Sequence, residues 1–217
     1  MIEKENKDLC TLYIIRHGET EWNLKNIVQG HSDSELTEAG IIQVQEAAEE
    51  LKEIHFDAVF SSDSPRTVRT AEIVRLDREL IIETSKLLRE RNYGRFEGKP
   101  SFEFKEVLRK KLAERKEMSD EEHWDFRLAD DIETDGELMT RFITQIREIS
   151  VAYPGKTVLV VTHGGCIRNF LIRTGYFNRR DLPSGSFKNA GYVKVLSDGV
   201  DFFIQLVRGV ETPGDSK

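Results

Sequence analysis

The stretch Leu12-Tyr13-Ile14-Ile15-Arg16-His17-Gly18-Glu19-Thr20 decides the fold of this chain. Its apolar run, followed by a charge and a glycine, predicts a fully buried strand over residues 11–15. The carboxyl ends of the strands form the ligand-binding edge of an open parallel sheet. Residues 158–165 repeat the pattern, with an apolar run that ends in His163-Gly164. We therefore expect the His17 and His163 imidazoles to lie side by side at one sheet edge.

Strands and helices alternate along most of the chain. Short apolar runs predict further strands at 57–62, 80–83 and 157–162, and helical periodicity follows Thr37, Ser64-Pro65 and Glu137. This alternation favours a parallel sheet with crossover helices. Asp198-Gly199 between two apolar runs predicts a terminal hairpin. The expected fold class is α/β, a three-layer α/β/α arrangement with a mostly parallel central sheet, helices on both faces and a small helical cap.

The region between the third and fourth expected strands is the least regular. Residues 87–98 read as a loop, Pro100–Glu117 reads as one charged amphipathic helix, and residues 118–135 are acidic and weakly patterned. We expect a single domain over residues 1–217, with a cap insertion at about 99–135. Residues 1–9 read as a loose polar lead-in, and residues 209–217 as a polar, disordered tail.

Composition narrows the class of protein. The formal net charge is −7, which argues against a nucleic-acid or anionic-membrane surface. The chain has two cysteines, Cys10 and Cys166, no signal-peptide pattern and no apolar run long enough for a membrane span. We expect a cytoplasmic protein, and the sequence does not indicate an oligomeric state. An anionic substrate would need a local basic pocket.

Such a pocket is predicted at the sheet edge. Arg16 and His17 end the first strand, Arg66 opens the helix after the second, and His163 ends the late strand. Guanidinium groups and helix N-termini suit a tetrahedral dianion, at roughly 1.5–3 kcal/mol for each charge-assisted hydrogen bond. A neutral imidazole can attack phosphorus and hold the phosphoryl group covalently. The pattern therefore favours phosphoryl transfer.

The leaving alkoxide in such a reaction needs a proton. A carboxylic acid near the pocket supplies it if the bound dianion favours the protonated form. Glu90 is the best-placed candidate, and Glu19 and Glu97 compete for the same role. A zinc site at His17 and His163 is the weaker alternative, because no ligand triad has metal spacing.

These motifs resemble those of the histidine phosphatase superfamily, the phosphoglycerate-mutase-like proteins. The likeness covers most of the chain in order, with blocks at Arg16–Asn23, Gln29–Gly40, Ser61–Ala71, Leu88–Gly98, Asp135–Glu137 and Val161–Gly164. Ser34-Glu35 and Asp135 depart from the usual residues of the family, which affects substrate specificity more than chemistry.

The resemblance implies a role for each matching residue. His17 would be the phosphorylated nucleophile, Glu90 the proton donor, and Arg16, Arg66 and His163 would hold the phosphoryl group. The expected substrate contacts are Asn23, Gln29, Gly30, Tyr93 and the Gly164 amide. Neither a metal ion nor an organic cofactor is implied, and the expected partner is a small phosphorylated metabolite.

Three functions remain open at this point. Phosphomonoester hydrolysis is favoured, because the mutases of the family carry an arginine pair followed by prolines in the cap, and this cap has none. They also tend to place asparagine after the second His-Gly, where this chain has Gly165. Phosphoglycerate-mutase-type transfer is the alternative. A binding module without activity is the third, and the intact His17, Glu90 and His163 argue against it.

Overall fold

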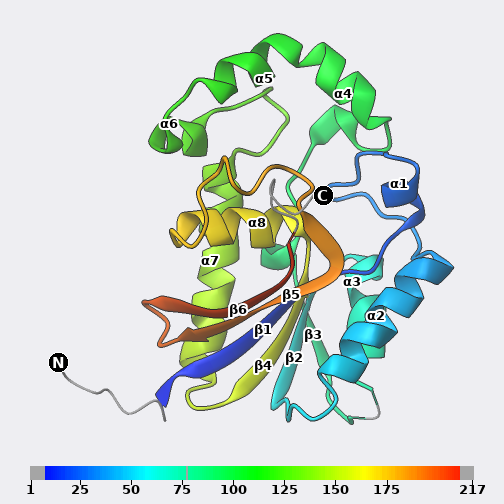
Figure 1. The fold of residues 1–217 in the computed structure, drawn as a ribbon, viewed down its shortest axis with the longest axis vertical. Helices are drawn as coiled ribbons and strands as arrows, with labels where there is room; N and C mark the ends of the chain where they lie inside the picture. Colours follow the sequence, from blue (N-terminus) through cyan, green and yellow to red (C-terminus); the bar gives the residue numbers. More distant parts are fainter. Residues whose placement is uncertain (1–7, 77, 211–217) are drawn as a thin grey trace.

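A computed structural model describes residues 8–76 and 78–210. Its six strands form one sheet in the order β3-β2-β4-β1-β5-β6 (Figure 1). The strands are β1 (Cys10–Arg16), β2 (Ala58–Ser62), β3 (Ile82–Ser85), β4 (Thr157–Thr162), β5 (Phe187–Ser197) and β6 (Phe202–Val210). The first four are parallel, whereas β5 runs antiparallel to β1 and pairs with β6 as the predicted hairpin. The mostly parallel sheet is confirmed.

Helices cover both faces of this sheet, as the α/β/α prediction requires. In β1, Leu12 and Ile14 face a core shared with α7 (Asp135–Ala152) and α8 (Gly164–Arg173). Tyr13 and Ile15 face the opposite core, shared with α2 (Glu38–Glu50) and α3 (Pro65–Val74). Side chains alternate across a strand, so an unbroken apolar run fits a strand covered on both faces.

The helix starts follow the sequence signals with one exception. Thr37 caps α2, and its side chain accepts a hydrogen bond from the Gly40 amide at 2.9 Å. Pro65 occupies the first turn of α3, as expected. The Ser64 side chain makes no capping bond, however, and instead contacts the Ser62 hydroxyl at 3.2 Å. This leaves the first turn of α3 without its own side-chain cap.

The cap contains three helices beyond the carboxyl ends of the parallel strands (Figure 1). They are α4 (Ser101–Val107), α5 (Arg109–Lys116) and α6 (Asp120–Asp125), so the single helix expected over Pro100–Glu117 is wrong. The helix breaks at Leu108, which is 6% exposed and packs with Phe96, Leu128 and Ile132. The chain bends around this small separate core. The apolar periodicity within one segment does not reveal such a bend, because the core is built by residues outside that segment.

Other boundaries shift by a few residues. The predicted strand at 80–83 lies at Ile82–Ser85, and the loop at 87–98 contains two short 3₁₀ turns, η2 (Lys86–Leu88) and η3 (Gly94–Phe96). A further short helix, α1 (Glu21–Leu24), follows β1. Strand β6 includes residues 209 and 210 of the expected tail, and the rest of that tail and residues 1–7 lie outside the described residues.

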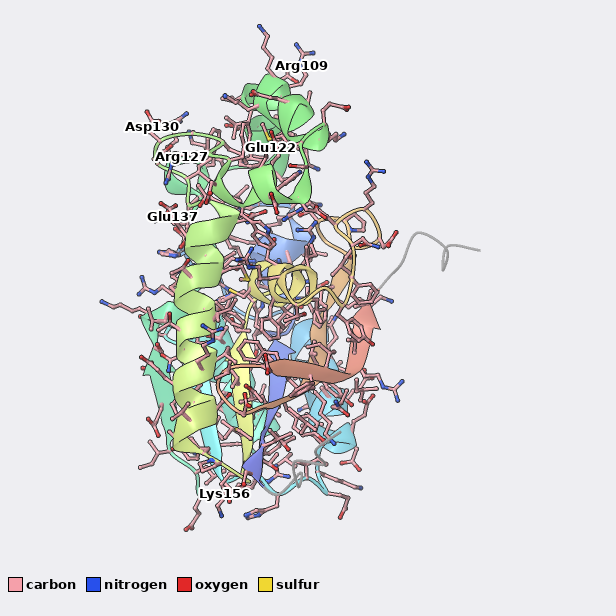
Figure 2. All side chains as sticks on the ribbon, turned by 90° about the vertical axis from the view of Figure 1, so that its left-hand side faces the viewer. Arg109, Glu122, Arg127, Asp130, Glu137 and Lys156 are labelled. Atoms are coloured by element: carbon pink, nitrogen blue, oxygen red, sulfur yellow. The ribbon has the colours of Figure 1, made fainter. Side chains whose placement is uncertain are left out.

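Helix α7 connects the cap to the far end of the sheet. Figure 2 shows it running from Glu137, beneath the cap, toward Lys156 at the opposite end of the molecule. Its N-terminus therefore lies close to the expected site. Among the described residues, no helix combines the length and apolar character needed to cross a membrane.

Candidate active site

The two histidines meet at the carboxyl edge of the sheet. Parallel pairing of β1 and β4 places Arg16 opposite Thr162, the last residues of the two strands, and a histidine follows each of them. The ring centroids of His17 and His163 lie 5.4 Å apart with an edge-to-face angle of 67°. His17 is 4% exposed and His163 is fully buried. The expected meeting of far-separated imidazoles is therefore present in the fold.

The hydrogen bond of His17 selects its tautomer. Its Nδ1 lies 2.7 Å from the Gly18 carbonyl oxygen. A carbonyl only accepts, so Nδ1 must carry the proton. Nε2 of the neutral ring is then left with a free lone pair. The backbone of the His-Gly turn thus fixes a tautomer in which Nε2 is free to act as an acceptor or to attack.

His163 has the complementary tautomer. Its Nδ1 lies 3.1 Å from Nη2 of Arg66, and a guanidinium only donates. Nδ1 of His163 must therefore accept, which places the proton on Nε2. That Nε2 is buried and has no hydrogen-bond partner. Of two neighbouring rings, one presents a lone pair and the other an N–H donor.

Electrostatics keeps both rings neutral. Burial lowers the pKa of His17 well below 6.5, and the charges of Arg66 and Arg16 lower it further. Burial and Arg66 likewise lower the pKa of His163 well below 6.5. Both effects disfavour an imidazolium in a site already rich in positive charge. His17 is consequently neutral throughout the neutral pH range, with the lone pair of Nε2 available.

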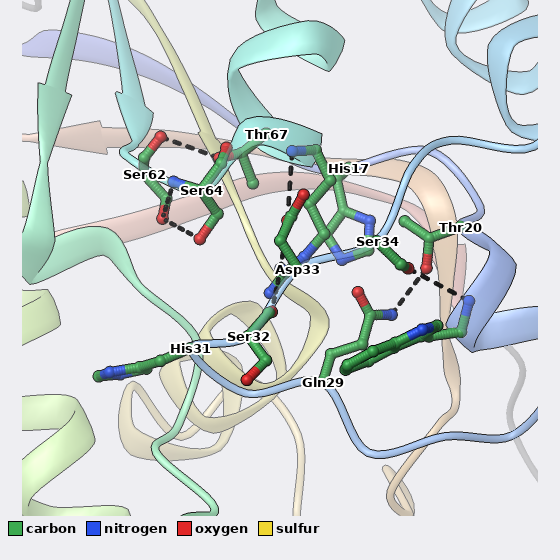
Figure 3. Close-up of polar contacts among 12 residues, drawn as sticks. His17, Thr20, Gln29, His31, Ser32, Asp33, Ser34, Ser62, Ser64 and Thr67 are labelled. Atoms are coloured by element: carbon green, nitrogen blue, oxygen red, sulfur yellow. Dashed lines mark hydrogen bonds and ion pairs between the residues drawn. The ribbon is translucent and has the colours of Figure 1, made fainter. Parts of the chain in front are cut away.

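Arg66 is buried deeply and held by the loop before α2. Its Nη1 donates to the carbonyl of Ser32 and to Oδ1 of Asp33, each at 2.7 Å. Its Nη2 donates to the Gly30 carbonyl at 2.8 Å and contacts His163. Figure 3 shows Ser32 and Asp33 near His17, with His31 pointing away. Both terminal nitrogens of Arg66 are thus occupied by protein groups, whereas its buried Nε has no partner.

Arg16 approaches the N-terminus of α8. Its Nη1 donates to the Phe187 carbonyl, and its Nε is buried without a partner. A Cβ on Gly164 would lie 3.0 Å from that Nε, so glycine permits the close approach. Burial lowers the pKa of Arg16 to about 10, which still leaves the guanidinium charged at neutral pH.

Glu90 is anchored to the same helix start. Its Oε1 accepts from the Arg91 amide at 2.8 Å, and its Oε2 accepts from the Gly165 amide at 2.9 Å. A Cβ at position 165 would lie 2.3 Å from Oε1, closer than any real contact. The bare backbone of Gly165 therefore provides both a donor and the space that this carboxylate occupies.

The two competing carboxylates have other partners. Glu97 accepts from the amides of His31, Ser32 and Tyr93 and from the Ser32 hydroxyl, and thereby organises the loop that holds Arg66. Glu19 accepts from the Thr37 hydroxyl at 2.8 Å at the start of α2. Both carboxylates stabilise loops, so Glu90 remains the candidate acid.

The predicted substrate contacts lie on loops, except for Asn23 in α1 and Gly164 at the start of α8. Gln29 is 8% exposed and donates to the Thr20 hydroxyl at 2.7 Å, while its Oε1 has no partner. Gly30 adopts a φ of +59°, and a Cβ there would overlap the Glu97 carboxylate. Asn23 forms a capping box with Thr20. Tyr93 packs edge-on against Phe104 of the cap, and burial raises its pKa to about 12.

Two supporting residues were not predicted. Arg141 of α7 donates to the carbonyls of Leu87, Arg89 and Glu90, and so holds the segment that carries the candidate acid. Asn189 donates to the His17 carbonyl at 3.1 Å and to Oδ1 of Asn23 at 3.2 Å. Both act on backbone groups far away in sequence, for which the sequence carries no local signal. Within residues 8–76 and 78–210, no group of three or more His, Cys, Asp or Glu side chains could hold a metal ion.

Comparison with known proteins agrees with this geometry. Residues 12–208 match the model of the histidine phosphatase superfamily (branch 1). Phosphoglycerate mutase-like protein 4 of Arabidopsis thaliana is 35% identical over 79% of this chain and 74% of its own length. The uncharacterized phosphatase PhoE of Bacillus subtilis is 34% identical, over 75% and 76% of the two chains. The structure of a phosphoglycerate mutase from Bacillus anthracis superposes with a TM-score of 0.81 at 29% identity, covering 93% and 94%.

Proposed function

The chain belongs to the histidine phosphatase superfamily, and from that premise we propose that it hydrolyses the phosphate monoester of a small metabolite without a metal ion. Three buried N–H groups without partners carry this proposal: Nε of Arg16, Nε of Arg66 and Nε2 of His163. An unpaired buried donor costs roughly 1–3 kcal/mol. A phosphoryl group, with its anionic oxygens, would satisfy all three beside the nucleophile.

The first half-reaction transfers the phosphoryl group to His17. The Nε2 lone pair attacks phosphorus, and the ester P–O bond breaks with its electron pair going to the leaving oxygen. Glu90, as the carboxylic acid, gives its proton to that oxygen. Nδ1–H of His17 stays bonded to the Gly18 carbonyl, which stabilises the positive charge that develops on the ring.

The second half-reaction returns the enzyme to its resting state. The Glu90 carboxylate removes a proton from a water molecule, whose oxygen attacks the phosphorus. The P–N bond then breaks, and its electron pair returns to Nε2 of His17. Arg16, Arg66 and His163 hold the phosphoryl oxygens throughout, which positions the group for transfer and stabilises the charge spread over its three equatorial oxygens in the transition states. Inorganic phosphate leaves as the second product.

Mutase-type transfer is the second candidate, because relatives named as mutases and as a phosphatase both match this chain. The two reactions share the phosphoenzyme and differ only in the acceptor. Hydrolysis is favoured where water reaches the phosphorylated ring faster than a second hydroxyl of a retained substrate does.

The test is the turnover of phosphate monoesters in the presence of a chelator. We expect hydrolysis to continue with EDTA, a radiolabelled phosphoenzyme to be trapped by rapid quenching, and both to vanish in His17→Ala. A His55→Ala variant is the matched control, because His55 is exposed and precedes the amino end of β2, whereas the site lies at the carboxyl ends of the strands. Loss of activity with chelator would contradict the proposal. Exchange between phosphoglycerates much faster than hydrolysis would assign the mutase reaction instead.

A further inference from the structure

The segment that carries Glu90, residues 87–92 and called the acid segment below, is held mainly by side chains. Four consecutive main-chain carbonyls in it accept hydrogen bonds from side chains of α7, β4 or α8, and they belong to Leu87, Leu88, Arg89 and Glu90. The 3₁₀ turn η2 includes only the first two of these residues. Buried main-chain groups need such partners. The position of the candidate acid therefore depends on the side chains that bind these carbonyls.

Arg141 of α7 supplies most of these hydrogen bonds. Its Nη1 donates to the carbonyls of Leu87 and Arg89, and its Nη2 donates to the carbonyl of Glu90 at 2.8 Å. Nε and the second N–H of Nη2 donate to the two carboxylate oxygens of Glu133, at 2.7 and 2.8 Å. A guanidinium has five N–H donors, and all five are used here. This arginine therefore has no donor left for a ligand.

The saturation of Arg141 distinguishes it from the arginines of the candidate phosphoryl site. Nε of Arg16 and Nε of Arg66 are both buried without a partner. The side chains of Arg141 and Glu133 are 17% and 14% exposed. Burial lowers the pKa of Arg141, but the hydrogen bonds to Glu133 and the negative charges nearby raise it above its ordinary value. Arg141 is thus a charged partner of protein groups.

Glu133 holds the other end of the acid segment. Its amide donates to the Asn92 carbonyl at 3.0 Å, and its Oε2 accepts from the Asn92 amide at 3.1 Å. Figure 2 shows Asp130 in the cap and Glu137 at the start of α7, and Glu133 lies between them in the sequence. Together with Arg141, this carboxylate therefore ties the acid segment to the point where the chain leaves the cap.

The carboxylate of Glu90 depends on where its own main chain lies. Its Oε2 accepts from the Gly165 amide at 2.9 Å, at the start of α8. Glu90 is thus bonded to α8 through its side chain and to α7 through its carbonyl, which accepts from Arg141. A misplacement of a catalytic group by about 1 Å can cost about 10²-fold in rate. The contacts of the carbonyl therefore matter for the chemistry of the side chain.

We propose that Arg141 and Glu133 form a positioning pair that sets the carboxyl group of Glu90 for proton transfer to the leaving oxygen. The inference rests on the proposed function and adds to it two residues that act through Glu90 without touching the substrate. Lysine cannot replace Arg141, because its ammonium has three donors at a single point instead of five in a planar fork. The arrangement of the donors, more than their charge, is what positions the acid.

Arg141→Lys tests the pair, with alkyl and aryl phosphate monoesters as substrates and rapid quenching to follow the phosphoenzyme. We expect phosphoenzyme formation from alkyl esters to slow by about 10- to 100-fold, because their leaving groups need the proton of Glu90. Formation from aryl esters, whose leaving groups need no proton, should slow by less than about twofold. Glu133→Gln should show the same selectivity with a smaller loss.

A double variant separates positioning from a general loss of stability. Arg141→Lys and Glu90→Gln affect the same proton transfer, so adding the first to the second should slow alkyl esters by less than about twofold more. Arg147→Met is the matched control and should react at the wild-type rate, because Arg147 is exposed on the same helix and lies over the Phe202 ring. Equal slowing of both ester classes by Arg141→Lys would overturn the inference and leave the proposed function standing. So would independent losses in the double variant.

Hydrogen exchange tests the pair without catalysis. The first amides of a helix lack intrahelical partners, so the protection of the Gly165 amide comes from Glu90. We expect that amide to exchange about tenfold or more faster in Arg141→Lys, and at the wild-type rate in Arg147→Met. If no phosphoenzyme forms with any ester, the proposed function fails, and this measurement decides the inference. Unchanged exchange in a folded Arg141→Lys variant would overturn it. If that variant does not fold, Glu133→Gln decides by the same criteria.

Discussion

At the scale of single residues, the site depends on where a side chain is missing. Gly165 donates its amide to Glu90 and leaves the space that the carboxylate fills. Gly164 leaves space for the guanidinium of Arg16 in the same way, without donating to it. Any larger residue would have to displace the Glu90 carboxylate or the Arg16 guanidinium. The two glycines therefore serve to position Glu90 and Arg16.

Gly165→Ala tests the positioning of Glu90. Alanine favours a helix interior by about 1 kcal/mol over glycine, which offsets part of the cost of displacing Glu90, so the variant should remain folded. Because its Cβ displaces Glu90, kcat for alkyl phosphates should fall by about 10²–10³-fold. Aryl phosphates, whose leaving groups need no proton, should be slowed far less. Parallel assays of the two ester classes and a thermal melt measure this.

Glu90→Gln provides the comparison for that variant. It should show the same dependence on the leaving group, and adding Gly165→Ala to it should cause little further loss. Equal slowing of alkyl and aryl esters by Gly165→Ala would contradict the assigned role. So would additive losses in the double variant.

At the scale of elements, the cap is a unit with its own small core. Leu108 breaks the helical region into α4 and α5 and packs with Phe96, Leu128 and Ile132. This core is separate from the two that cover the sheet. Arg115 joins the cap to Asp135 at the start of α7. The cap can therefore lose stability locally while the sheet stays folded.

Leu108→Ala tests this independence. Removing a buried leucine side chain costs roughly 2–5 kcal/mol. We expect amide hydrogen exchange across α4 and α5 to speed up by about 30-fold or more, with strands β1 and β4 unchanged. Val107→Ala is the matched control, because Val107 is adjacent and 63% exposed. Faster exchange of equal size in β1 and β4 would show that the cap and sheet unfold together.

At the scale of the whole molecule, the fold buries two histidines, His17 and His163, that resist protonation. The pKa values of His17 and His163 are lowered well below 6.5 in the fold, whereas an unfolded chain binds protons near 6.5. Above that pH both states are neutral, so the rings contribute no pH dependence. Below it the unfolded state takes up protons that the folded state excludes. Stability is therefore lost as the pH falls.

Denaturant titrations between pH 7.5 and 5 measure this loss. Each ring should contribute a slope that approaches about 1.4 kcal/mol per pH unit below about 6.5. The double variant His17→Asn/His163→Gln should lose most of that slope. His55→Asn, which changes an exposed histidine, should keep it. An unchanged slope in the double variant would mean that other groups control acid stability.

The sequence by itself determined the sheet, the helices on its faces and the edge at which the histidines meet. Apolar runs ending in His-Gly, together with the Thr37 cap and Pro65, are local signals, and parallel strands align their carboxyl ends. The ordered blocks around these signals also identified the family. In the cap, periodicity predicted one helix where there are two. Leu108 packs there into a core that residues distant in sequence build.

Only the tertiary structure decided the electrostatic state of the site. The tautomer of His163 depends on Arg66, whose position depends in turn on the loop at Gly30, Ser32 and Asp33. Arg91, Arg115 and Arg179 likewise meet only because separate segments converge on the buried Asp135. A residue's own neighbours in sequence set its backbone conformation, but hydrogen-bond partners and buried charge come from groups that folding brings together.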